Sequence, residues 1–346
     1  MTKKLFTILS VLLVGSMLLA ACSTTEVTTK IKVCQITDTG GIDDMSFNAT
    51  AWKGITDAQA QLGIEGKYLE SKEVADYEKN LNAFLEEKCD LIVTVGFMIG
   101  DATKAAAEAN PDVKFSIVDY NYAPVIPNVV GQIFETDEAA FLAGYLAAGV
   151  TKTGVVGTFG GLPIPTVTIF MDGFYKGVAK YNEVKGTDVK VLGWDPAAPD
   201  SGLFSMSFDD QQKGNELAKS LMDEGADIIM PVAGPVGWGS AAAIKERGNA
   251  YLIGVDSDWA VDPTNGPTYA DIILTSVMKL MDATTMQVIQ SVIDGTFKGG
   301  DVVGTLANNG VAIAPFHELE SLVSAELAAE IEQLKAEIIA GTITLD

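Results

Sequence analysis

Short runs of consecutive apolar residues alternate with longer amphipathic stretches from residue 31 onward, and this alternation limits the possible folds most. Clear apolar runs are Leu91–Val95 and Ile228–Val232, whereas residues 47–62 have helical spacing. Apolar runs without a polar face are typical of strands buried on both sides, as in parallel sheets with crossover helices. The strand–helix–strand order is completed once and then begins again. The sequence therefore predicts an α/β protein with two doubly wound parallel-sheet lobes.

The C-terminal part adds a predicted helix over 276–293, a strand pair within 302–314 and an acidic helix over 325–339 whose charges are expected to face solvent. No low-complexity linker separates the lobes, which indicates several chain crossings between them rather than one. The expected boundaries place residues 31–133 and 259–303 in lobe 1, and residues 134–258 and 304–346 in lobe 2.

The first 22 residues have the features of an export signal. Lys3 and Lys4 precede an apolar stretch that is too short for a convincing membrane span. It ends in Leu-Ala-Ala-Cys at residues 19–22, which resembles the lipobox of bacterial lipoproteins, where Cys22 would carry lipid. The alternative is an ordinary signal peptide with a chance cysteine. We expect a lipid anchor at Cys22, a tether over 23–30 and a location on the extracytoplasmic face of the cell membrane.

The charge of the chain excludes several kinds of partner. It has 46 acidic and 23 basic side chains, a formal charge of −23, a single arginine and a single histidine. Nucleic-acid binding needs clustered basic residues, so no nucleic-acid partner is expected. One histidine excludes a multi-histidine metal site. We expect neither a metal nor a cofactor.

Two further cysteines, Cys34 and Cys89, follow the export signal. Outside the membrane a disulfide between them is chemically possible. Both lie in or beside apolar strands, however, and buried thiols behave as small hydrophobic side chains. We therefore favour two free buried thiols.

A polar cluster follows the first predicted strand, over residues 37–48. Ligands of open parallel sheets lie beyond the carboxyl ends of the strands, so this turn is in the right place for a site. The spacing G-x-G-x-x-G is missing, and the aspartates would repel a pyrophosphate. Asp38 and Asn48 are ligand candidates, whereas Asp43, Asp44 and Ser46 are interpreted as helix caps and turn residues.

Other strand ends carry similar groups. Asp119 and Asp256 each end an apolar strand, and carboxylates at converging strand ends are suited to bind the vicinal hydroxyls of a sugar. Glycines flank Phe97, and Gly234 and Trp238 follow the strand 228–232. Phe47 and Trp238 are candidates to stack on a planar base, the alternative being ordinary core aromatics.

Catalytic patterns are missing from the sequence. Neither G-x-S-x-G, H-E-x-x-H nor a phosphate-binding P-loop is present. His317 lies in the C-terminal segment and is interpreted as structural. These observations favour a binding protein over an enzyme.

The motif Asp38-Thr-Gly-Gly-Ile-Asp-Asp-Met-Ser-Phe-Asn48 resembles the signature of the basic membrane protein family of ABC-transporter substrate-binding lipoproteins, which includes purine nucleoside receptors. Further similar segments, spread over 31–346, are Gly96–Asp101, Phe141–Tyr145, Gly254–Asp258, Leu274–Lys279 and Gly304–Gly310. The resemblance implies a type I periplasmic-binding-protein fold, with two α/β lobes, three hinge crossings and a ligand enclosed between the lobes.

The resemblance also implies roles for individual residues. Phe47 would stack on a base whose edge Asp38 and Asn48 bind, and the ribose hydroxyls would be held by Asp119, Asp256 and Lys279. The second stacking position is not plainly aromatic, since Met-Pro-Val at 230–232 occupies the expected strand end. Either Trp238 takes that position or a different ligand binds.

The function expected from these observations is a monomeric, lipid-anchored receptor that captures a nucleoside, in the first place a purine nucleoside, for an ABC permease. The near absence of arginine argues for an uncharged ligand rather than a nucleotide. One alternative is a receptor for another small polar solute, such as a sugar or a modified nucleoside. A second is an extracellular hydrolase on the same scaffold, and a role as a surface adhesin would coexist with ligand binding.

Overall fold

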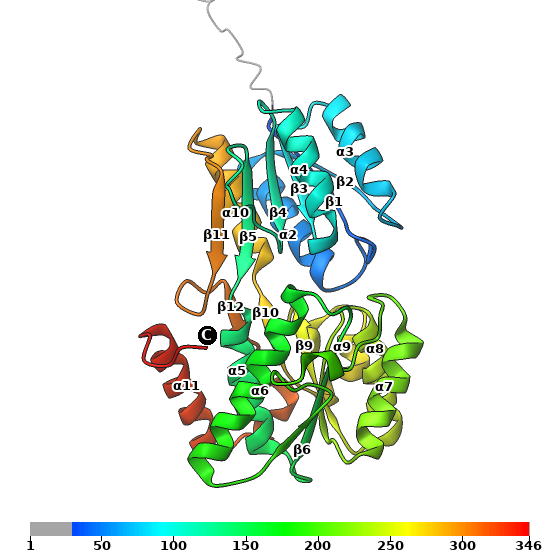
Figure 1. The fold of residues 1–346 in the computed structure, drawn as a ribbon, viewed down its shortest axis with the longest axis vertical. Coiled ribbons are helices and arrows are strands. Elements are labelled where there is room, and N and C mark those ends of the chain that lie inside the picture. The colour runs from blue at the N-terminus through cyan, green and yellow to red at the C-terminus, as the bar shows by residue number, and fades with distance from the viewer. Residues whose placement is uncertain (1–29, 346) are drawn as a thin grey trace, which may run out of the picture. The chain divides into compact units, whose positions relative to one another are not determined.

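The apolar runs form two six-stranded sheets in the computed structural model, which describes residues 30–345 (Figure 1). The expected lipid-anchor residue Cys22 and nearly all of the tether lie outside the described residues. The first sheet and its helices, called lobe 1, comprise β1 (Lys32–Ile36), α2 (Phe47–Leu62), β2 (Glu65–Leu69), α3 (Asp76–Glu86), β3 (Leu91–Val95), α4 (Gly100–Ala109), β4 (Lys114–Val118), β5 (Val129–Phe134), α10 (Met281–Ile293) and β11 (Gly300–Gly304).

The second sheet and its helices are called lobe 2. They comprise α5 (Thr136–Val150), β6 (Val155–Gly160), α6 (Pro165–Lys185), β7 (Lys190–Leu192), α7 (Gln211–Asp223), β8 (Ile228–Val232), α8 (Val236–Arg247), β9 (Tyr251–Asp256), α9 (Gly266–Tyr269), β10 (Ile273–Lys279), β12 (Val311–Ile313) and α11 (Ala325–Ile339).

Both sheets have doubly wound topology. The strand orders are β11-β5-β4-β3-β1-β2 and β12-β10-β9-β8-β6-β7, and every pairing is parallel except that of β12 with β10. Strands β3 and β8 are buried along their whole length, as expected for strands covered by helices on both faces. The predicted fold class is confirmed.

The boundary expected at residue 259 is wrong. Strand β10 (Ile273–Lys279) is hydrogen-bonded to β9 in the second sheet, so this strand belongs to lobe 2 and only α10 and β11 return to lobe 1. The predicted helix over 276–293 begins only at Met281, because the run Ile-Leu-Thr-Ser-Val-Met before it is nearly all buried in the sheet. Two strands do lie within 300–313, but the expectation that they pair with each other is wrong, since β11 and β12 lie in different sheets.

The chain passes between the lobes three times, after β5, after β10 and after β11. Backbone hydrogen bonds tie these crossings together: Glu135 N donates to Gly304 O at 2.9 Å, and Leu280 N donates to Gly310 O at 2.9 Å. The three crossings therefore form a connected hinge at one edge of the sheets. None of the helices among residues 30–345 is long and apolar enough to span a membrane.

Cys34 and Cys89 form a disulfide whose Cα atoms are 6.1 Å apart, so the expectation of two free thiols is wrong. Both residues are buried, as the apolar pattern indicated. The pattern could not reveal the pairing, because the two cysteines are 55 positions apart and meet only where β1 pairs with β3.

Removal of this disulfide is expected to destabilise lobe 1, because the bond restricts a long loop in the unfolded chain. For Cys34→Ala/Cys89→Ala we expect the free energy of unfolding to fall by about 2–4 kcal/mol in urea titrations. As the control, a reductant should lower the stability of the wild type towards that of the variant and leave the variant unchanged. Two titratable thiols in the non-reduced, denatured wild type would contradict the assignment.

Candidate functional site

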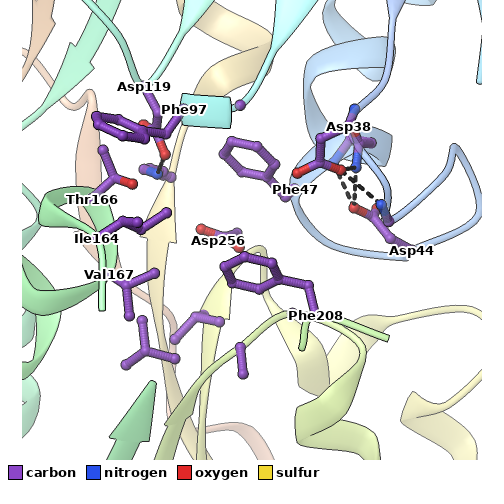
Figure 2. Close-up of a pocket in the computed structure, with 18 of the residues that line it drawn as sticks. Asp38, Asp44, Phe47, Phe97, Asp119, Ile164, Thr166, Val167, Phe208 and Asp256 are labelled. Atoms are coloured by element: carbon purple, nitrogen blue, oxygen red, sulfur yellow. Dashed lines mark hydrogen bonds and ion pairs between the residues drawn. The ribbon is translucent and has the colours of Figure 1, made fainter. Parts of the chain in front are cut away.

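A pocket lies between the carboxyl ends of the strands of both lobes, with about 630 Å³ of empty space that includes its open side (Figure 2). The residues that carry its polar and aromatic chemistry are Asp38, Asp44, Phe47, Asn48, Phe97, Asp119, Phe208, Asp256 and Lys279.

At one end of the pocket, Asn48 connects two carboxyl groups (Figure 2). Its Nδ2 donates to Asp38 Oδ1 at 2.7 Å and to Asp44 Oδ2 at 3.0 Å, while its Oδ1 accepts from Asp38 N at 3.1 Å. Both amide hydrogens are therefore used inside the protein. Asn48 lies at the pocket, as predicted, but in this arrangement it orients Asp38 and has no free donor for a ligand.

Asp44 caps helix α2. Its carboxylate accepts hydrogen bonds from the backbone N–H groups of Ser46 at 3.0 Å, Asn48 at 2.7 Å and Ala49 at 3.0 Å. This agrees with its interpretation as a cap residue. Asp38 Oδ1 is occupied by Asn48 and by the N–H of Gly40, whereas its Oδ2 accepts no hydrogen bond from residues 30–345. Asp38 thus offers one free carboxyl oxygen to the pocket, and burial raises its pKa.

At the other end of the pocket lies Asp119 with its partner Lys279, and Asp256 lies between this pair and Asp38 (Figure 2). The Lys279 ammonium binds Asp119 Oδ2 at 2.6 Å, and the two side chains are only 3% and 8% exposed. Asp256 Oδ2 accepts from the Ser46 hydroxyl at 3.1 Å, and its Oδ1 is free of bonds from the described residues. Asp119 and Asp256 both have positive φ, of 67° and 68°, a conformation that is uncommon for residues other than glycine and often marks functional positions.

The pocket contains four aspartates and one basic side chain, Lys279. Burial raises the pKa of Asp44 to about 7 and that of Asp256 to about 6, and in Asp256 it outweighs the opposing effect of Lys279. The only basic side chain in the pocket lining, Lys279, is already bound to Asp119, so no free cation is left there for an anionic ligand. The arrangement favours a neutral ligand with hydrogen-bond donors.

Two phenylalanine rings lie on opposite sides of the pocket (Figure 2). Phe47 begins α2 in lobe 1, and Phe208 lies in the loop before α7 in lobe 2. Phe208 was not predicted from the sequence, because no strand or helix pattern places its loop near a strand end. The loop packs on Gly161, where a Cβ atom would lie 2.2 Å from the Phe208 ring.

The structure places the remaining predicted residues differently. Phe97 and Gly234 line the pocket. Trp238 does not: it is 5% exposed and stacks on Trp259 with ring centroids 4.0 Å apart. Its prediction as a ligand contact is wrong for this geometry, because helix α8 directs the indole into the core of lobe 2.

Hydrogen bonds between the lobes close the pocket beside Asp256. The Ser46 hydroxyl donates to Val255 O at 3.2 Å as well as contacting Asp256, and the Ser257 hydroxyl donates to Met45 O at 3.2 Å. The sequence analysis interprets Ser46 only as a helix-cap or turn residue. The structure gives it a second role, since it joins the first turn of α2 to the end of β9.

Residues 31–346 match the profile of the family described as ABC transporter substrate-binding protein PnrA-like. The chain belongs to this family. It is 29% identical over 367 residues to the ABC transporter nucleoside-binding protein BmpA of Lactococcus lactis, covering 100% of this chain and 99% of that protein. It is 33% identical over 312 residues to basic membrane protein A of Borreliella burgdorferi, covering 89% and 85% of the two chains.

A solved ABC transporter solute-binding protein from Aeropyrum pernix K1 has the same architecture. Its TM-score is 0.80 at 27% identity, and the match covers 91% of this chain and 92% of that one. The expected periplasmic-binding-protein fold is therefore confirmed. The protein is thus an ABC transporter substrate-binding protein, and the pocket between its lobes is its candidate ligand site.

The buried carboxyl groups of this PnrA-like protein lead to a prediction about pH. A carboxyl whose pKa is raised on folding holds its proton more tightly in the folded state, so its contribution to stability is present at low pH and lost as the pH rises through about 6 to 7. We expect the ligand-free protein to gain about 1–3 kcal/mol between about pH 7.5 and about pH 5 in urea titrations.

Asp256→Asn should reduce this gain and leave the part due to Asp44, whereas Asp112→Asn, on the exposed surface, should leave the profile unchanged. Equal profiles for Asp256→Asn and the wild type would contradict the contribution assigned to Asp256.

Proposed function

We propose that this protein binds a nucleoside, in the first place a purine nucleoside, between its lobes and delivers it to an ABC permease. The proposal rests on the order in which carboxyl groups and aromatic rings lie along the pocket. A free carboxyl oxygen of Asp38 lies at one end, the rings of Phe47 and Phe208 lie in the middle with Asp256 between them, and Asp119 lies with its partner Lys279 at the other end.

Each part of a nucleoside has a counterpart in this order. The two phenyl rings offer faces for a planar base, and stacking on aromatic side chains contributes about 1–3 kcal/mol per base. Asp38 Oδ2 would accept from a ring N–H group, as a 6-oxopurine presents at N1. Asp256 Oδ1 and the Lys279–Asp119 pair would bind the 2′- and 3′-hydroxyl groups of the ribose.

Membership in the family supports this assignment, as does the lactococcal relative named as a nucleoside-binding protein. A receptor for a sugar is the second candidate, because the diol end of the pocket alone would suffice for it. The facing rings favour a base. We further propose that Cys22 carries the lipid anchor on the extracytoplasmic face, and that the protein acts as a monomer.

We also propose that the protein binds its ligand without chemical change. Incubation of the purified protein with inosine, followed by chromatography, should give no free hypoxanthine. Release of the base in stoichiometric excess over protein would favour the hydrolase alternative.

Ligand-induced stabilisation tests the choice of ligand. Inosine or guanosine should raise the melting temperature, whereas ribose and inosine 5′-monophosphate at equal concentration should not. Ribose lacks a base that could stack, and inosine 5′-monophosphate brings a phosphate to a pocket with four aspartates and one lysine. An equal shift with ribose would instead favour a sugar receptor.

The stacking role is tested by Phe208→Ala, which should weaken inosine binding about 5- to 150-fold, as expected for the loss of one stacking face. Trp238→Phe is the matched control, because Trp238 lies outside the pocket lining. The dissociation constant of inosine from this variant should stay within about threefold of the wild-type value. Calorimetry that found the larger loss in Trp238→Phe would reverse this assignment.

A further inference from the structure

A second chamber adjoins the pocket at the end where Asp119 and Lys279 lie. It holds about 850 Å³ of empty space, part of it open solvent, and shares Phe97, Asp119, Thr166 and Lys279 with the main pocket. Figure 2 shows Asp119, Phe97 and Thr166 together at this end, away from Asp38 and Asp44. The chamber therefore borders the main pocket at this end.

The walls of the chamber are mostly apolar. The unshared apolar lining consists of Ile133, Phe134, Pro165, Ile169 and the ring of Tyr120, and the unshared polar lining consists of Asn121 and Thr136. Helix α6 contributes Pro165 and Ile169, and strand β5 contributes Ile133 and Phe134.

The aromatic wall is held in place by its own packing. Tyr120 contacts Phe97 with ring centroids 5.1 Å apart and Tyr122 at 5.0 Å, and Tyr122 Oη donates to Gly100 O at 2.7 Å. Gly100 permits this arrangement, since a Cβ atom there would lie 2.5 Å from the Tyr120 ring. The ring of Tyr120 is thus held between two aromatic neighbours.

The only charged residues among those that line the chamber are Asp119 and Lys279, and they are bonded to each other at 2.6 Å. No unpaired cation is left there for a phosphate. An uncharged, largely apolar group would match these walls best, because it would leave the ion pair intact and bury apolar surface.

This inference rests on the proposed function. With the base between Phe47 and Phe208 and the 2′,3′-diol on the carboxylates, the 5′-carbon is the remaining exocyclic carbon of the ribose beside Asp119 and Lys279. We propose that the site also takes purine nucleosides that carry an uncharged apolar substituent at the 5′ position, such as a 5′-alkylthio group, with the substituent in the chamber beside Tyr120 and Ile169.

The experiment compares the dissociation constants of inosine, 5′-deoxy-5′-(methylthio)inosine and inosine 5′-monophosphate by calorimetry on the protein without its export signal. We expect the thioether to bind within about tenfold of inosine, and the monophosphate at least about 100-fold more weakly. If inosine binds but the thioether binds at least about 100-fold more weakly than inosine, this inference is wrong and the proposed function stands. Failure of inosine itself to bind would overturn both.

Ile169→Trp tests the position of the substituent, because a larger side chain there would fill the chamber. The ratio of the thioether to the inosine dissociation constant should rise at least about tenfold. Val184→Trp, an exposed position near the other end of α6, should leave the ratio unchanged. An unchanged ratio in Ile169→Trp would show that the substituent does not enter the chamber and would overturn the proposal.

Discussion

The buried ion pair between Lys279 and Asp119 is the interaction on which the site depends. Lys279 is the last residue of β10 in lobe 2, and Asp119 follows β4 in lobe 1, so the pair joins the lobes beside a hinge crossing. The ammonium also lies 4.9 Å from the centroid of the Phe47 ring. Removal of either partner would leave a buried charge without compensation.

The charge of the pocket determines what can enter it. One ammonium group faces four carboxyl groups, and the ammonium is already paired. Carboxylates accept hydrogen bonds and repel anions, which suits the hydroxyl and ring N–H groups of a neutral nucleoside. The acidity of the whole chain says little about the ligand, but the near absence of basic groups around the pocket excludes a bound phosphate on electrostatic grounds.

Many of the strands, and most of the polar and aromatic residues of the site, could be predicted from the sequence. Strands such as β3 and β8 were predictable because a strand buried on both faces is a continuous apolar run. Asp38, Asp119 and Asp256 were predictable because each directly follows a strand, and the ends of parallel strands meet at one edge of a sheet. Strand β10 was mistaken for part of the following helix, because a short apolar run does not by itself distinguish strand from helix.

The remaining features depend on which segments meet in space. Phe208 lies on an irregular loop, and Cys34 and Cys89 pair only because β1 and β3 are neighbours. Trp238 was misplaced because the direction in which a helix presents a side chain depends on its packing against the sheet.

The sequence by itself therefore determined the fold class and the strand-end carboxylates, because both are encoded in local patterns along the chain. Only the tertiary structure decided which aromatic ring faces Phe47, whether the amide hydrogens of Asn48 are free to bind a ligand, and whether a second chamber adjoins the pocket. These are contacts between distant segments, and local pattern carries no information about them.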